Sequence, residues 1–185
     1  EAYLEKIRCR LLGLPCEILQ TKRCIVREIC LDDVDKLYEI YADPSITLYM
    51  EGLYAKKDEE IAYTRDYIRY QYGIYDFGMW IIEDEQSGEV IGRAGLDLRP
   101  DREDAELGYM IRKNRQGQGL AYEVCTAILA YAKEELGFEK LFARTRKENL
   151  ASVMLLKKLG FHPVCAQSET KEADNAQIEY YIALS

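Results

Sequence analysis

The residues best suited to chemistry lie in the middle of the chain, where basic side chains come directly before a pair of glycines. The basic residues are Arg112, Lys113 and Arg115, and the glycines are Gly117 and Gly119. Glycine lets a backbone approach a ligand closely, and cations attract negative charge. In a chain with a net charge of −8 such a cluster is locally unusual. The segment predicts an anion-binding site, although a solvated surface cluster would have the same composition.

A predicted strand leads into this segment and a predicted helix leaves it. Apolar side chains alternate with others over residues 105–111 and recur at helical spacing over residues 121–136. The first turn of a helix has backbone N–H groups without partners, and the helix dipole places about half a positive charge there. The glycine-containing turn would therefore hold an anion against the start of the helix.

Two common phosphate-binding motifs do not match this turn. The chain has no G-x-x-x-x-G-K-[ST] sequence, so the turn is not a Walker loop. The G-x-G-x-x-G spacing of a dinucleotide site also fails, and the predicted strands upstream form a meander. The anion must be held in another structural context.

A second polar segment begins at Asn149 and ends at Gly160-Phe161. Asn149 can cap a helix, and Gly160 is a typical residue just after a helix end. Ser152 would lie in the first turn of this helix. The two polar side chains have two interpretations, a cap with a polar first turn or a ligand contact, and the first does not exclude the second.

The remaining pattern predicts a single domain. Helices are predicted over residues 1–13, 32–43 and 58–72, and strands over residues 23–29, 79–82, 90–96, 140–145 and 177–184. A meander followed by a strand–turn–helix unit indicates an α/β (α+β) fold, with a central mixed, mostly antiparallel sheet flanked by helices. We interpret residues 1–21 as an N-terminal helical extension or linker and residues 22–185 as the domain.

Composition and charge exclude several classes of partner. A net charge of −8 argues against nucleic acid and fits a cationic substrate better. No apolar run approaches the roughly 18 residues of a membrane helix, and the N-terminus lacks the apolar core of a signal peptide. We expect a cytoplasmic protein without a membrane partner. Because the chain begins at Glu1, an extension upstream is left open.

The cysteines and the histidine do not predict a metal site. The six cysteines include no C-x-x-C pair, and the one histidine is His162. We expect neither a metal nor a disulfide. Cys125 falls on the apolar face of its predicted helix, where a buried small side chain is the simpler interpretation than a nucleophile.

Tyrosines concentrate between Tyr38 and Tyr75, where nine of the fifteen occur. Their rings can pack a half-buried pair of helices, or they can form the wall of a substrate site. Both interpretations can hold for different members of the set.

The glycine turn and the second polar segment, in this order, resemble the GNAT superfamily of N-acetyltransferases. Gln116-Gly117-Gln118-Gly119-Leu120-Ala121 matches the [RQ]-x-x-G-x-[GA] acyl-CoA turn of that family. The segment from Asn149 to Phe161 resembles the N-x-x-S-x-x-[VL]-[LY]-x-K-x-G-F block of the ribosomal-protein alanine and serine acetyltransferase branch. The resemblance covers residues 22–184 and implies an acetyl-CoA-dependent enzyme.

The resemblance also implies which residues bind the cofactor. Two splayed neighbouring strands would leave backbone groups open to the pantetheine arm of acetyl-CoA. The turn would hold the pyrophosphate, and the second polar segment would lie beside the pantetheine arm. The implied cofactor-binding residues are Met110, Ile111, Arg112, Gln116, Gly117, Gln118, Gly119, Leu120, Ala121, Asn149 and Ser152.

Acetyl transfer to an amine needs a base, because an alkylammonium has a pKa of about 10.4 and is mostly protonated at neutral pH. The resemblance makes Glu106 the candidate, with an ordinary strand carboxylate as the alternative, and a backbone N–H around Met110 would polarise the thioester carbonyl. Many family members protonate the leaving thiolate with a tyrosine, but the matching position is Leu156. Ser152 is the catalytic candidate to stabilise the thiolate instead; water or a tyrosine from residues 38–75 would also serve.

Two functions are open on the sequence alone. The first is acetyl-CoA-dependent N-acetylation of a primary amine, on a small molecule or a protein N-terminus. The second is a catalytically weak or inactive CoA-binding sensor or partner module, which Leu156 keeps under consideration. The acceptor, the acyl-chain preference and the choice between a monomer and a homodimer are also open.

Overall fold

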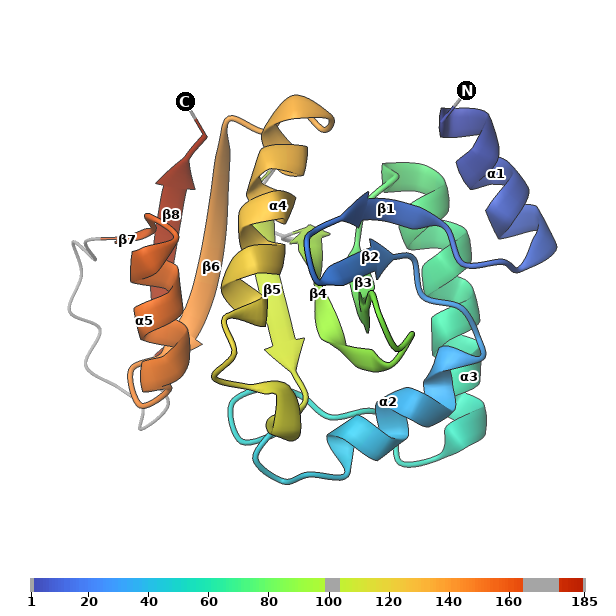
Figure 1. The fold of residues 1–185 in the computed structure, drawn as a ribbon, viewed down its shortest axis with the longest axis horizontal. Coiled ribbons are helices and arrows are strands. Elements are labelled where there is room, and N and C mark those ends of the chain that lie inside the picture. Colours follow the sequence, from blue (N-terminus) through green and yellow to red (C-terminus); the bar gives the residue numbers. More distant parts are fainter. Residues whose placement is uncertain (1, 99–103, 165–176, 185) are drawn as a thin grey trace.

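The computed structural model describes residues 2–98, 104–164 and 177–184, and their strands form one sheet (Figure 1). The 8 strands follow the order β1-β2-β3-β4-β5-β6-β8-β7. All neighbours are antiparallel except β5 and β6, which are parallel. The predicted mixed, mostly antiparallel sheet flanked by helices is confirmed.

The elements lie close to their predicted positions. The strands are β1 (Glu17–Gln20), β2 (Cys24–Arg27), β3 (Met79–Asp84), β4 (Val90–Leu98), β5 (Ala105–Ile111), β6 (Lys140–Arg146), β7 (His162–Pro163) and β8 (Gln177–Ala183). The helices are α1 (Ala2–Leu12), α2 (Asp33–Tyr41), α3 (Lys57–Asp66), the π-helix η1 (Tyr67–Tyr75), the 3₁₀ turn η2 (Lys113–Arg115), α4 (Leu120–Glu134) and α5 (Leu150–Lys158). Among the described helices, none combines the length and the apolar character needed to cross a bilayer.

The first 21 residues are more than a linker. The predicted N-terminal helix is found as α1, but residues 17–20 form β1, which pairs with β2 at the edge of the sheet. Lys6 and Arg10 of α1 each pair with Asp76 at 2.7 Å, and Arg10 also pairs with the buried Glu28. Tertiary ion pairs therefore hold this extension against the rest of the fold, and helical periodicity does not reveal them.

The pairing between β5 and β6 ends early, although both strands are described throughout. Ala105 pairs with Leu141 and Glu106 with Phe142, and the strands then separate, as Figure 1 shows. On its other edge β5 stays paired with β4 along its whole length. One edge of β5 is therefore open from residue 107 onward. The predicted splayed strands are confirmed.

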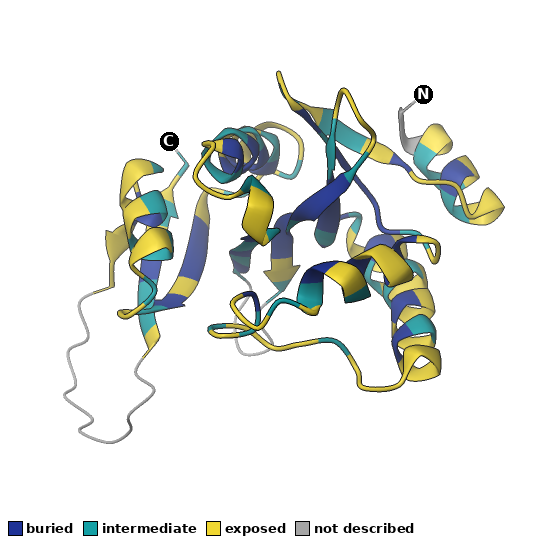
Figure 2. Cartoon of the chain, turned by 60° about the horizontal axis from the view of Figure 1, so that its bottom comes forward, coloured by how far each residue is buried: buried dark blue, intermediate teal, exposed yellow. Residues whose placement is uncertain are grey.

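The main core lies between the sheet and α4. The inner side of α4, including Val124, Ile128 and Ala132, has no exposed surface, and Figure 2 shows buried residues gathered in the central strands and on inward helix faces. Trp80 of β3 meets Tyr131 of α4 edge-on at 5.7 Å. Burial of one valine or isoleucine side chain contributes about 1.5–3 kcal/mol. The core therefore fixes the helix that begins at the glycine turn.

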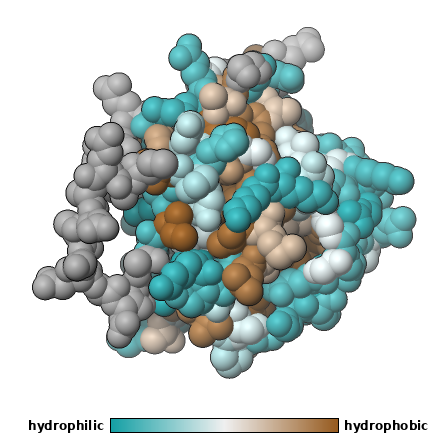
Figure 3. Space-filling model, turned by 90° about the vertical axis from the view of Figure 1, so that its left-hand side faces the viewer, coloured by the Kyte–Doolittle hydropathy of each residue, from teal (hydrophilic) through white to brown (hydrophobic). Residues whose placement is uncertain are grey.

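Apolar side chains are exposed on the side that carries α5 and β8. Leu150 and Met154 of α5 are 68% and 71% exposed. Figure 3 views this side and shows apolar surface between hydrophilic side chains. Scattered exposed apolar residues are common on monomeric proteins. They do not by themselves indicate a homodimer.

Gly95 of β4 provides a test of the close packing between β3 and β4. A Cβ at Gly95 would lie 2.0 Å from the carbonyl oxygen of Gly78, so the strands would have to move apart. We expect Gly95→Ala to lower the free energy of unfolding by about 1–3 kcal/mol, measured by urea denaturation. Gly73→Ala in η1 is the control, because a Cβ there meets nothing within 4 Å. Equal losses in the two variants would contradict this account.

Candidate active site

A cleft of about 1280 Å³ lies over the separation of β5 and β6. The N-terminal turns of α4 and α5 line one side of it, and residues 45–54, α3 and η1 line the other. Because side chains alternate along a strand, β4 and β5 present two different faces to these sides. We call them the α4 face, where Leu107 and Tyr109 point, and the η1 face, which carries Arg93, Asp97, Glu106 and Met110.

The turn before α4 offers unpaired backbone donors. The N–H groups from Gly117 to Ala121 make no hydrogen bond within the described residues. Gly117 and Gly119 have φ angles of 75° and 78°, in the left-handed region where other residues are strained. A Cβ at Gly117 would meet nothing within 4 Å, so the space above the turn is open. The turn can therefore accept an anion at the start of α4.

The three members of the predicted basic cluster have different surroundings in the structure. Arg112 pairs with Glu89, and Arg115 pairs with Asp84 and Glu89. Both carboxylates belong to the end of the β3–β4 hairpin, so the arginines brace the turn against it. Lys113 lines the cleft and makes no ion pair within the part of the chain that the structure describes. Lys113 is therefore the member of the cluster most available to a ligand.

The connection between β1 and β2 also holds the start of α4. Arg23 donates from Nε to Glu123 at 2.7 Å and from Nη1 to the carbonyl oxygen of Gln118 at 3.0 Å. Thr21 donates to Glu123 at 2.8 Å. Burial acts to raise the pKa of Glu123, but the hydrogen bonds from Thr21 and Arg23 lower it overall. Glu123 therefore stays ionised and ties the first helical turn to the sheet edge.

The open edge of β5 presents the backbone of Tyr109. The N–H of Arg112 donates to the carbonyl oxygen of Ile91 at 2.8 Å, and hydrogen-bonded pairs alternate along an antiparallel ladder. Met110, which lies opposite Arg93, therefore bonds to β4. The N–H of Tyr109 points the other way, toward β6. Among the backbone donors around Met110, the N–H of Tyr109 is therefore the one available at the open edge.

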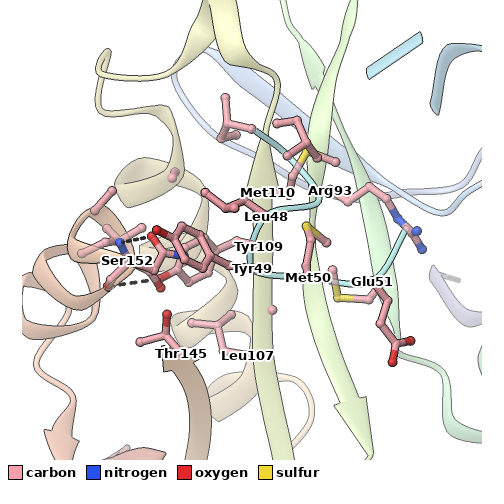
Figure 4. A pocket seen from close by; sticks show the side chains of 18 of the residues that line it. Leu48, Tyr49, Met50, Glu51, Arg93, Leu107, Tyr109, Met110, Thr145 and Ser152 are labelled. Carbon is pink, nitrogen blue, oxygen red and sulfur yellow. Dashed lines mark hydrogen bonds between the residues drawn. The ribbon is translucent and has the colours of Figure 1, made fainter. Parts of the chain in front are cut away.

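Tyr109 also contacts the predicted catalytic serine. Its phenol oxygen lies 2.7 Å from Oγ of Ser152 (Figure 4). Asn149 caps α5 by accepting the N–H of Ser152 at 3.3 Å, so the predicted cap is confirmed. Burial raises the pKa of Tyr109, and the bond to Ser152 only partly offsets this, so the phenol is protonated at neutral pH. Leu156 is buried, and its hydrocarbon side chain cannot act as a general acid for a leaving thiolate.

Two carboxylates lie side by side on the η1 face. Asp97 and Glu106 are directly opposite each other in the β4–β5 ladder. Glu106 accepts a hydrogen bond from Nε of Arg144 at 2.8 Å, whereas Asp97 accepts one from the phenol of Tyr67 at 3.2 Å. Asp97 is open to the cleft, but the surrounding walls desolvate it and raise its pKa, with Tyr67 and Arg93 acting in the opposite direction. Asp97 is therefore more basic than an ordinary surface aspartate.

Tyrosines from the predicted cluster occupy both expected environments. Tyr72 of η1 is fully buried. Other members line the cleft, where their rings contact one another in a row at tilted angles with centroids 5.6 and 5.9 Å apart; these are Tyr54, Tyr63 and Tyr67. The cluster thus builds part of the core and one wall of the cleft.

The cleft brings together most of the predicted site residues. Lining it are Glu106, Met110, Ile111, Gln116, Gly117, Gly119, Leu120, Ala121, Asn149 and Ser152. Arg112 and Gln118 do not line it. The side chain of Arg112 turns to Glu89, and that of Gln118 donates to the carbonyl oxygen of Asn114 at 3.4 Å. A ligand would meet these two residues through their backbone.

Sequence reasoning missed Arg93, Asp97 and Tyr109. Their placement depends on the register between β4 and β5, which no local pattern specifies. One signal was present for the first two residues. Arg93 and Asp97 are the charged residues in the otherwise apolar and glycine-containing strand β4, and charge within such a strand indicates a special environment.

The raised pKa of Asp97 predicts a pH-dependent effect on stability. A carboxyl group whose pKa is higher in the folded state favours folding while it is protonated, below about pH 4, and this contribution is lost as the pH rises through the folded pKa. Asp97→Asn should therefore raise the thermal midpoint at neutral pH and have less effect at about pH 4.

Glu85→Gln, which removes the same charge from an exposed turn, is the control for this measurement. It should show no comparable dependence on pH. Destabilisation by Asp97→Asn at neutral pH would contradict the assignment.

Comparison with known proteins gives a consistent result. Residues 23–162 match the acetyltransferase (GNAT) domain. An uncharacterized N-acetyltransferase of Bacillus licheniformis is 28% identical over 174 residues, which cover 90% of this chain and 94% of that protein. These matches include the turn before α4 and the start of α5.

Solved structures share the fold. RimL, a ribosomal-protein α-N-acetyltransferase solved in complex with coenzyme A, superposes with a TM-score of 0.73 at 16% identity, covering 90% of this chain and 97% of that one. A spermidine N-acetyltransferase from Vibrio cholerae, solved with CoA and spermine, has a TM-score of 0.69 at 21% identity and covers 87% and 95%. With a family match across most of its length, this chain belongs to the GNAT family of acetyltransferases.

Proposed function

We propose that this chain transfers the acetyl group of acetyl-CoA directly to a primary amine. The observation that carries the proposal is the separation of β5 from β6. The anion-binding turn and the open edge of β5 lie on one side of it, and Asp97 and Glu106 lie on the other. An amine that enters along the η1 face would reach a thioester held along β5.

The residues around the turn fit the cofactor. Acetyl-CoA would supply the acetyl group as a thioester. The N–H groups from Gly117 to Ala121 would bind its pyrophosphate, and Asn149 and Ser152 would flank its pantetheine arm. The N–H of Tyr109 would polarise the thioester carbonyl. Two structural neighbours were solved with CoA, which supports this choice of cofactor.

The carboxylate pair would handle the proton of the amine. An alkylammonium has a pKa of about 10.4, so it is protonated at neutral pH and must lose a proton before its nitrogen can attack. We assign this role to Asp97, whose pKa is raised and which makes no ion pair with a cation within the described residues. Glu106, held by Arg144, would stabilise the ammonium before transfer.

The pair of Tyr109 and Ser152 would serve the leaving group. Their oxygens are 2.7 Å apart, and both residues border the open edge of β5. A protonated phenol bonded to a serine hydroxyl can donate a hydrogen bond to the departing sulfur. This pair would compensate for Leu156, which was the main argument for a module without turnover.

The lining of the cleft favours a cationic acceptor. Its η1 side carries Glu51, Glu60, Asp97 and Glu106, which outnumber the one cation Arg93 of β4 and β5 on that face, together with a tyrosine wall. One structural neighbour was solved with spermine and another is named a ribosomal-protein α-N-acetyltransferase, which supports either a small amine or a protein N-terminus as the acceptor. Release of free CoA thiol with a panel of amines and N-terminal peptides would test the proposal. Absence of turnover across the panel, despite CoA binding, would refute it.

Gly117→Ala tests the pyrophosphate site. The added methyl group would strain a left-handed residue and project into the open space above the turn. We expect CoA to bind about tenfold more weakly, a change of about 1.4 kcal/mol, measured by calorimetry. Gly13→Ala is the matched control, since Gly13 has a φ of 65° and also has no neighbour within 4 Å of a Cβ, but it follows α1. If both variants bind CoA as the parent does, the turn is not the binding site.

Substitution of the two carboxylates separates their roles. Asp97→Asn should lower kcat by about 100-fold or more, as expected for loss of a general base, with the Kd for CoA unchanged. Glu106→Gln should act mainly through a higher KM for the amine. Steady-state kinetics over a range of amine concentrations would measure both. A larger loss of kcat in Glu106→Gln would return the role of base to Glu106.

A further inference from the structure

Arg93 is a charged residue of the cleft that the proposed reaction does not use. It lies on the η1 face in the middle of β4. Its Nε is shielded from solvent and has no hydrogen-bond partner, and within the described residues no carboxylate lies within 4 Å of its guanidinium. Arginine keeps its charge in proteins. The floor of the cleft therefore holds a cation without a matching anion.

The groups around Arg93 are mainly phenols. Figure 4 shows its side chain extending over β4 toward the loop that carries Met50 and Glu51, away from Tyr109 and Ser152. Burial acts to lower the pKa of Arg93, but nearby phenols raise it overall; these are Tyr41, Tyr72 and Tyr67. A neutral phenol accepts a hydrogen bond but does not neutralise a guanidinium.

The nearby carboxylates are engaged elsewhere or lie too far away to pair with Arg93. Glu60 lines the same small cavity as Arg93, but it accepts the backbone N–H of Tyr54 at 2.9 Å. Asp97 accepts the phenol of Tyr67; the charge of Arg93 acts on Asp97, but the two side chains do not form an ion pair. Glu51 is exposed on the loop that Arg93 approaches and makes no ion pair with it. A shielded charge without a partner is costly to the fold, and such groups cluster at functional sites.

We propose that Arg93 binds a carboxylate of the acceptor, so that the acceptor carries an amine at one end and a carboxylate at the other. This inference rests on the proposed acetyl transfer in the same cleft. Arginine suits the role because its guanidinium presents two parallel donors to a carboxylate.

The spacing along β4 limits how far apart the two charges of the acceptor are. Arg93 and Asp97 point to the same face four residues apart, so their Cα atoms are separated by about 13 Å at about 3.3 Å per residue. An amine at Asp97 and a carboxylate at Arg93 are thus several bonds apart. An ω-amino acid, the side-chain amine of a basic amino acid or a short peptide meets this requirement, and an α-amine beside its own carboxylate does not.

Matched acceptors test the inference on the unmodified enzyme. The series runs from glycine through β-alanine and 4-aminobutanoate to 6-aminohexanoate, and each member is compared with its own carboxamide. We expect kcat/KM for the longer amino acids to exceed that for their carboxamides by about tenfold or more, as charge-assisted bonds to arginine allow. Equal rates for acids and carboxamides along the whole series would overturn the inference.

Substitutions at Arg93 connect this preference to the residue. Arg93→Gln should abolish the preference, mainly through a higher KM for the acids, so that the ratio of kcat/KM for each acid to that for its carboxamide falls to about 1. Arg93→Lys should retain part of it, since the charge remains but the paired donors are lost. Arg69→Gln is the control, because Arg69 is exposed on η1 outside the cleft. The ratio of two substrates on one sample does not depend on the fraction of folded enzyme.

Calorimetry separates failure of this inference from failure of the proposed function. If amines are acetylated but Arg93→Gln keeps the preference for acids, the inference is wrong and the function stands. If no acceptor is acetylated, titration of 6-aminohexanoate and its carboxamide into the CoA-bound protein decides. Binding of the acid that is lost in Arg93→Gln supports the inference. Equal or absent binding of the two compounds overturns it.

Discussion

Hydrogen bonding between β5 and β6 stops after Glu106 and Phe142, and the rest of the cleft depends on this separation. A continued ladder would have used the backbone of Tyr109 within the sheet, and the two faces of the sheet would have had no passage between them. β5 remains ordered because its other edge is fully paired with β4, and β6 is supported in the same way by β8. An open strand edge normally invites aggregation. Here it lies inside a cleft and is available to a ligand.

The charges around the turn before α4 mostly position it. Arg112 and Arg115 are held by carboxylates of the β3–β4 hairpin, and Arg23 is held by Glu123. These pairs connect the start of α4 to strands distant in sequence, so the donors of the turn keep their direction before any ligand binds. Preorganised donors are effective because they need little rearrangement when charge arrives. The net positive character of the segment is smaller than its composition implies.

Features of this protein that depend on near neighbours in the sequence could be predicted, whereas features that depend on contacts between distant residues could not. The turn, the Asn149 cap and the strand entering the turn depend on neighbours a few residues apart, and all were predicted. The backbone donor expected around Met110 could not be assigned to one residue, because side-chain alternation does not reveal which edge of a strand is hydrogen-bonded. The role of residues 17–20 was missed because a four-residue edge strand has too short a pattern to stand out.

The sequence by itself indicated the family through the resemblance of two motifs, and it predicted the strand–turn–helix unit and a candidate anion site, because glycine placement and apolar periodicity act locally. Only the tertiary structure decided which side chains of the cleft lie next to one another. The register of β4 against β5 places Asp97 beside Glu106, and the packing of α5 brings Ser152 to Tyr109. It also leaves Arg93 within a set of phenols and without a carboxylate partner among the described residues. Such pairings join residues far apart in the chain, and long-range packing rather than local preference selects them.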